Sequence, residues 1–264
     1  MKNLKQRIRR GETVIGCWLN LGSSLSAEMV GLAGFDWVLI DLEHGAGTEK
    51  DVLFQLQALE HGTAAPIIRV EGFERQRIHR VLDYGAEGIM CPRIKTASEA
   101  KQAANAMRYT PEGLRGVAKM VRATNFGVNF DDYLAGVRDN LIGVIQIETE
   151  EALGCLDDIA ATEGVDVLFI GPSDLTMALG IFGQFDHPRF IDALKATADA
   201  ARKAGKATGV LLYNPDHFGQ FHRLGFTFIA SGADAGFVNT GARAMVKKLS
   251  GYRSEYGSKR DSVD

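Results

Sequence analysis

The feature of this sequence that most constrains its fold is a regular alternation between short apolar runs and segments with helical spacing. The runs are rich in Val, Ile, Leu or Phe, and most end at Gly, Pro or a polar residue, as parallel strands buried on both faces do. They cover residues 13–20, 35–44, 65–70, 87–93, 141–148, 165–172, 207–214 and 226–234. Eight such strands, mostly followed by helices, predict an α/β protein with one closed (β/α)8 TIM barrel.

An open, doubly wound sheet is the structural alternative. It is disfavoured because no Gly-x-Gly-x-x-Gly motif follows the first run. The chain has 264 residues, and such barrels commonly take about 250 residues as a single domain. We therefore expect the barrel to occupy residues 1–250 and the polar residues 251–264 to form a frayed tail. Residues 110–140 interrupt the alternation and predict a functional loop with a short helix.

Composition and charge exclude several classes of protein. A formal net charge of −3 argues against a nucleic-acid partner, which usually requires a clustered basic surface. No apolar run reaches the roughly 18 residues that cross a bilayer, and no apolar region typical of a secretory signal follows the charged N-terminal residues. The cysteines Cys17, Cys91 and Cys155 are too far apart to suggest a disulfide framework. We expect a cytoplasmic protein with free thiols.

Two carboxylates stand at the ends of neighbouring predicted strands, where barrel enzymes place their catalytic groups. Glu148 and Asp174 are 26 residues apart, which is about one strand–helix repeat. Oxygen ligands from adjacent strand ends, with open positions for water and substrate, suit Mg²⁺ or a similar cation. Gln146 and Glu148 have period-two spacing, so both should face the barrel interior. Position alone leaves open that Glu148 and Asp174 are ordinary loop carboxylates.

Other strand ends carry further polar side chains. His44 follows the second run, after Asp41 and Glu43, and could act as a general base. Asp83 could orient its imidazole. Arg69 occupies an inward-facing position, where it needs a carboxylate or an anionic substrate. A structural histidine and a structural salt bridge are the alternatives for His44 and Arg69.

The segment that follows the sixth run could contact an anion through its backbone. It comprises Gly171, Pro172 and Ser173, directly before a helical stretch. Taken alone, this is a weak signal.

The order and spacing of four motifs resemble the HpcH/HpaI aldolase family, the class II pyruvate aldolases. The motifs are GFDWVLIDLEH, RYTPEGLRGV, IQIETEEA and IGPSDL, and the resemblance covers nearly the whole chain. It implies a metal-dependent aldolase that reversibly cleaves a 4-hydroxy-2-oxo acid to pyruvate, or a close analogue, and an aldehyde. The cofactor it implies is a divalent cation: Mg²⁺, Mn²⁺ or Co²⁺.

The resemblance also assigns roles to individual residues. Glu148 and Asp174 match the metal ligands, and His44 matches the catalytic base. Asp83 matches the acid that makes this base stronger, and Arg69 matches the group that stabilises the transition state. Gln146 and the backbone of Gly171, Pro172 and Ser173 match substrate contacts.

Assembly and specificity are further expectations from the resemblance. The family exchanges its last helix between partners, which implies a homo-oligomer, a hexamer built as a trimer of dimers. Gly45-Ala46-Gly47 replaces the usual Ala-Pro-Asn after Glu-His, and Arg93 and Lys95 stand where apolar and amide residues are usual. Residues 233–238 also differ. These segments border the predicted mouth, so the resemblance does not identify the aldehyde.

Two other functional classes remain open at this point. The first is a carbon–carbon lyase on the same barrel that forms a Schiff base, for which Lys95 is the one lysine near a strand end. The second is a barrel without catalytic activity that binds an oxo acid or a partner.

Overall fold

The structure is a computed structural model, and it describes residues 2–257. Eight parallel strands form a closed barrel in which each strand pairs with the next and β8 pairs with β1. This confirms the predicted (β/α)8 fold. The strands are β1 (Val14–Leu19), β2 (Trp37–Asp41), β3 (Ala65–Arg69), β4 (Gly88–Cys91), β5 (Ile142–Ile147), β6 (Val167–Ile170), β7 (Ala207–Leu212) and β8 (Phe226–Ala233).

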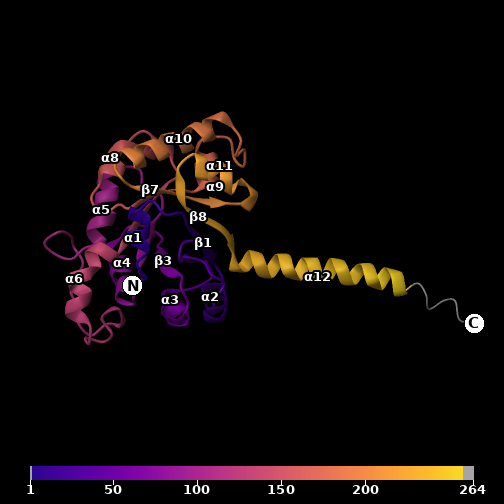
Figure 1. Cartoon of the computed structure of the whole chain (residues 1–264), viewed down its shortest axis with the longest axis horizontal. Helices are drawn as coiled ribbons and strands as arrows, with labels where there is room; N and C mark the ends of the chain where they lie inside the picture. The colour runs from indigo at the N-terminus through magenta and orange to yellow at the C-terminus, as the bar shows by residue number, and fades with distance from the viewer. Residues whose placement is uncertain (1, 258–264) are drawn as a thin grey trace, which may run out of the picture.

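Helices surround the barrel on its outer side (Figure 1). The α-helices are α1 (Leu4–Arg9), α2 (Ser24–Gly31), α3 (Glu49–Ala58), α4 (Arg75–Asp83), α5 (Ala97–Met107), α6 (Phe130–Asn140), α7 (Glu150–Leu153), α8 (Leu156–Ala161), α9 (Pro172–Ala178), α10 (Pro188–Lys203), α11 (Phe218–Arg223) and α12 (Asp234–Gly257). Short 3₁₀ helices are η1 (Leu59–His61), η2 (Arg122–Thr124) and η3 (Pro215–His217). The apolar residues between strands and helices form one continuous core.

The interior of the barrel is filled by large side chains. Trp18, Trp37, Phe169 and Phe228 pack together there, and the rings of Trp37 and Phe228 stack with centroids 4.0 Å apart. Leu4 of α1 belongs to the same cluster, so this N-terminal helix packs onto the barrel interior. The interior is therefore a packed core and not an open pore.

The interruption between β4 and β5 is organised around one buried arginine. Arg115 donates to Asp83 of α4 at 2.8 Å and to the hydroxyl of Tyr133 at 2.9 Å. Its guanidinium also lies 4.5 Å from the ring centre of Tyr109. The short helix expected within residues 110–140 is α6. Arg115 links it to α4 and to the segment after α5.

The last helix leaves the barrel. α12 extends as a single straight helix away from the other elements (Figure 1). We expected it to end at residue 250, but residues 251–257 continue the helix, and the rest of the expected tail lies outside the described residues. Polar and charged residues are interspersed along α12. No helix among residues 2–257 has the length and apolar character needed to cross a membrane.

Close packing in the barrel interior predicts a large effect from one added methyl group. A Cβ at Gly16 would lie 2.2 Å from the buried ring of Trp37. We expect Gly16→Ala to lower the free energy of unfolding by about 1–3 kcal/mol, the usual cost of overpacking. Urea denaturation measures this loss. Gly116→Ala is the matched control, since a Cβ there meets no atom within 4 Å. Equal stability of both variants would contradict the packing.

Candidate active site

A cavity of about 490 Å³ opens at the carboxyl ends of the strands. Its lining comes from the ends of β1, β2, β3, β5, β6, β7 and β8, or from the residues that follow them. Seven of the predicted site residues line it: His44, Arg69, Gln146, Gly171, Pro172, Ser173 and Asp174. Glu148 lies next to them, and Asp83 does not. No residue of the segment 110–140 lines this cavity within the described chain.

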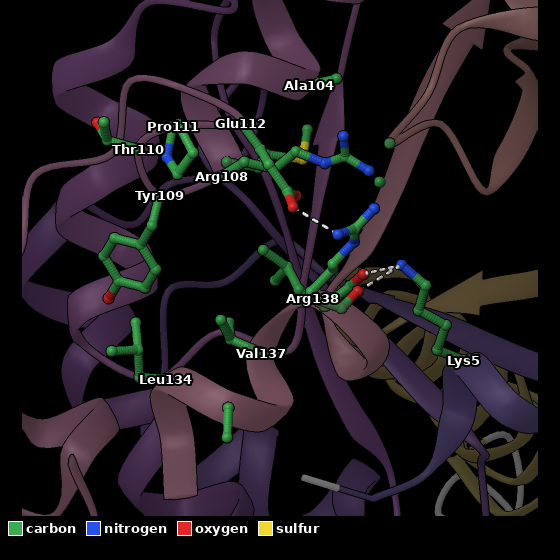
Figure 2. Close-up of a pocket in the computed structure, with 15 residues that line it drawn as sticks. Lys5, Ala104, Arg108, Tyr109, Thr110, Pro111, Glu112, Leu134, Val137 and Arg138 are labelled. Atoms are coloured by element: carbon green, nitrogen blue, oxygen red, sulfur yellow. Dashed lines mark hydrogen bonds and ion pairs between the residues drawn. The ribbon is translucent and has the colours of Figure 1, made fainter. Parts of the chain in front are cut away.

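A second cavity, of about 250 Å³, lies near the start of β5 (Figure 2). Figure 2 shows Lys5 and Arg138 on one side of it and Tyr109 on the other. Its charged groups are already paired, because Lys5 contacts Asp166 at 2.9 Å and Arg138 pairs with Glu112. This cavity lies away from the strand ends where the predicted residues gather. We therefore place the candidate site in the cavity at the strand ends.

Arg69 is held by two carboxylates from the neighbouring strand. Its Nε and Nη2 donate to Asp41 at 2.8 and 2.7 Å, and its Nη1 lies 3.0 Å from Glu43. Asp41 and Arg69 are register partners in the β2–β3 pairing, which brings them side by side. Burial opposes the charge of Arg69, but the hydrogen bond and charge of Asp41, with Glu43, outweigh it and raise the pKa of Arg69. The guanidinium is a fixed cation in the cavity.

Glu148 is a buried carboxylate that forms no ion pair with any residue among 2–257. Its Oε1 accepts from the backbone N–H of Arg93 at 2.6 Å, and its Oε2 accepts from Gln146 at 3.0 Å. Burial raises the pKa of Glu148 to about 7 despite the Arg93 hydrogen bond, and the charges of Asp174 and Glu43 add to the rise. Arg93 has a φ of 53°, so this N–H reaches the carboxylate from a left-handed backbone.

The surroundings of Glu148 fit a divalent cation. Asp174 is exposed on the cavity lining and makes no hydrogen bond or ion pair within residues 2–257. The Oε1 atom of Gln146 is buried without a partner. A cation between the two carboxylates would relieve their repulsion and the burial cost of Glu148. The described chain has no group of three or more His, Cys, Asp or Glu placed as metal ligands, so water and substrate would complete the coordination.

The structure separates the predicted pair of His44 and Asp83. His44 is exposed at the mouth, and its Nε2 lies 3.8 Å from Glu43. Asp83 belongs to the last turn of α4, and its carboxylate is paired with Arg115. Because α4 runs back from the end of β3 toward the start of β4, its last turn is remote from the strand ends. The expected contact is therefore not made within one chain, and the carboxylate beside the imidazole is Glu43.

Several cavity residues had no role in the sequence analysis. Asn20 donates from Nδ2 to Asp41 at 2.8 Å and so supports the arginine pair. Tyr213 lines the opposite side, and its hydroxyl is 2.8 Å from Ser173 Oγ. In the sequence, Asp41 stands at a strand end without an assigned role. It stands two residues after Leu39, a core residue of the barrel interior, so alternation could have predicted that it faces inward beside Arg69. No such signal marks Tyr213.

The lining contains no lysine among the described residues. Lys95 is partly exposed, and its ammonium lies 3.5 Å from Glu151 outside the cavity. A Schiff base requires a lysine amine that reaches the substrate carbonyl. The arrangement therefore disfavours the Schiff-base alternative.

Comparisons with known proteins agree with this geometry. A model of the HpcH/HpaI aldolase/citrate lyase family matches residues 14–240. The 4-hydroxy-2-oxo-heptane-1,7-dioate aldolase of Salmonella arizonae is 38% identical over 263 residues, which is 97% of this chain and 100% of that protein. The hydroxypyruvate/pyruvate aldolase of Agrobacterium fabrum is 38% identical over 249 residues, 94% of this chain and 93% of its own. The crystal structure of a family protein from Burkholderia cenocepacia is 36% identical with a TM-score of 0.89, and covers 94% of this chain and 99% of that one.

The buried pair of Asp41 and Arg69 predicts a stability effect. In Asp41→Asn, a side chain of nearly the same shape remains beside the guanidinium of Arg69, but the negative charge that offsets the burial of this cation is lost. We expect the free energy of unfolding to fall by about 3 kcal/mol, the usual cost of breaking a buried pair. Asp199→Asn in the exposed pair with Arg202 is the control, and should cost below about 1 kcal/mol. Urea denaturation compares them, and similar losses would refute the role of burial.

Proposed function

Because the chain belongs to the HpcH/HpaI aldolase/citrate lyase family and is an aldolase, we propose that it cleaves a 4-hydroxy-2-oxo acid reversibly. The products are pyruvate, or a close analogue, and an aldehyde. The observation that carries this proposal is the convergence of Arg69, Gln146 and two carboxylates on a cavity whose described lining lacks a lysine.

Glu148 and Asp174 would hold the divalent cation, which is Mg²⁺, Mn²⁺ or Co²⁺ in this proposal. Bound there, the cation supplies Lewis acidity beside the carbonyl of the oxo acid. The raised pKa of Glu148 and the unpaired Asp174 support these ligands.

The protein's own residues bind the oxo acid and stabilise its enolate. Arg69 places a fixed positive charge where negative charge develops on the C2 oxygen, and Asp41 prevents this guanidinium from turning away. Gln146 has a free buried acceptor for the substrate. The backbone of Gly171, Pro172 and Ser173 would contact the carboxylate of the substrate. A Cβ at Gly171 would lie 2.6 Å from Glu148, so glycine leaves the carboxylate its position.

His44 moves the proton in this scheme. In cleavage it accepts the proton of the C4 hydroxyl through a water, and in condensation it returns that proton. Its exposure at the mouth leaves room for that water, and Glu43 can balance the imidazolium.

We further propose that the protein forms a homo-oligomer, a hexamer built as a trimer of dimers, in which α12 is exchanged between copies. Apolar side chains on α12 are half or more exposed in the single chain: Val238, Met245, Val246 and Leu249 at 56–64%. On α2 and at the residue that follows it, Leu25, Met29 and Leu32 are 65–69% exposed and follow helical spacing. Exposed apolar surface on both helices favours their burial between copies. A cytoplasmic location is proposed from the three free cysteines.

Removal of the metal tests the catalytic proposal. We expect thorough chelation with EDTA to abolish pyruvate release from 4-hydroxy-2-oxo acids, and added Mg²⁺, Mn²⁺ or Co²⁺ to restore it. Asp174→Asn should lower kcat/KM by about 100-fold or more, since one ligand charge is lost. Asp158→Asn on the exposed face of α8 is the matched control.

Two outcomes would contradict this mechanism. The first is activity that survives chelation. The second is a stable lysine adduct after borohydride treatment with pyruvate, and Lys95→Arg would then abolish both adduct and activity. No turnover with any of the cations would favour a barrel that only binds.

A charge on α12 tests the assembly. We expect Met245→Glu to lower the molar mass measured by light scattering, because a carboxylate would have to enter an apolar contact. Lys247→Glu changes charge on the other side of the same helix and should leave the mass unchanged. An unaltered mass for both variants would refute the role of α12.

A further inference from the structure

The candidate cavity has a reactive side and a remaining wall. The groups assigned to the reaction lie at or just after the ends of β2, β3, β5 and β6. Most of the remaining lining comes from β7, β8 and β1, with side chains from Trp18, Asn20, Leu211, Leu212, Tyr213 and Ala233. In the proposed function the oxo acid would occupy the reactive side, so the far end of the aldehyde can extend along this wall. The wall is therefore placed to discriminate between aldehydes.

Tyr213 is fixed on this wall although it is 59% exposed. Its hydroxyl is 2.8 Å from Ser173 Oγ, and its ring stacks on Phe185 with centroids 5.4 Å apart. Phe185 in turn contacts the buried ring of Phe190. Contacts at both the ring and the hydroxyl hold the phenol in one place, which lowers the entropic cost of using it to bind a ligand.

The hydroxyls of Tyr213 and Ser173 can still form hydrogen bonds with a ligand. One of them donates to the other, so the pair still has one O–H hydrogen and several lone pairs. A substrate hydroxyl, which both donates and accepts, suits this pair. An alkyl group at the same place would leave the remaining O–H donor and the lone-pair acceptors without hydrogen-bond partners.

The charge around the cavity disfavours an anionic aldehyde. Arg69 is the one cation among the described residues of the lining, and it is already bound to Asp41 and Glu43. Arg93 gives its backbone N–H to Glu148 but does not line the cavity. A second carboxylate on the substrate would therefore lie near like charges without a cation of its own.

We propose that Tyr213 is a specificity-determining residue that, with Ser173, selects aldehydes that are neutral and hydroxylated. This inference rests on the proposed aldolase function. It predicts a preference for glyceraldehyde over propanal, which lacks the hydroxyls, and over succinic semialdehyde, which is anionic.

The experiment measures kcat/KM for condensation of pyruvate with these three aldehydes. For the unaltered protein, we expect kcat/KM with glyceraldehyde to be at least tenfold higher than kcat/KM with propanal or with succinic semialdehyde. In Tyr213→Phe, the ring and its stacking remain, and the ratio of glyceraldehyde to propanal should fall about tenfold. Ser173→Ala keeps the backbone and should lower the ratio in the same direction. Tyr84→Phe removes a hydroxyl that pairs with Glu49 outside the cavity, and should leave the ratio unchanged.

The outcomes separate this inference from the proposed function. Exchange of the pyruvate methyl protons with solvent deuterium needs no aldehyde, so it reports the enolate step alone. Suppose that the unaltered protein exchanges these protons but Tyr213→Phe leaves the ratio of glyceraldehyde to propanal unchanged, including through equal losses of kcat/KM for both aldehydes. This result overturns the inference and leaves the proposed function standing. A preference for succinic semialdehyde also overturns it. Absence of exchange with every cation overturns the proposed function and, with it, the inference.

Discussion

Side chains on a strand alternate between the inside and the outside of the barrel, and this constraint decides which residues of this chain can act together. Leu39 and Ile67 face the interior core, so Asp41 and Arg69, two residues further along, also face inward at the end of their strands. The same rule brings Gln146 and Glu148 inward after Val144. The side chains that form the interior core therefore also fix the direction of the polar side chains at the carboxyl ends of the strands, which we call the polar layer.

That polar layer contains more negative than positive charge. Asp41, Glu43 and Glu148 surround one arginine. Asp174 lines the cavity without an ion pair among the residues that the structure describes. Burying a carboxylate is costly, and like charges nearby add to the cost. The raised pKa of Glu148 expresses first its burial and then the charges of Asp174 and Glu43. In the proposed function, a divalent cation would neutralise this excess negative charge. It would also allow an anionic oxo acid to bind beside the carboxylates.

The sequence indicated the barrel because buried parallel strands have a strong apolar signature, and alternation was enough to place Arg69, Gln146 and Glu148. Other features required the folded chain. Asp83 stands near a predicted strand, but its partner Arg115 comes from the irregular segment after α5, which no periodicity positions. Tyr213 resembles any surface residue after a strand until its contacts with Ser173 and Phe185 are seen. The direction of α12 depends on the surface against which it packs, so local sequence patterns could not predict it.

The aromatic cluster inside the barrel has a kinetic consequence. Trp18, Trp37, Phe169 and Phe228 close the passage toward the other end, so the site is a dead end with one entrance. Arg69 and Gln146 lie deep, whereas His44 and Tyr213 stand at the opening. A molecule held by the deep groups has to enter before one held at the opening, and must leave after it. If Arg69 and Gln146 bind the oxo acid as proposed, the oxo acid binds first and departs last.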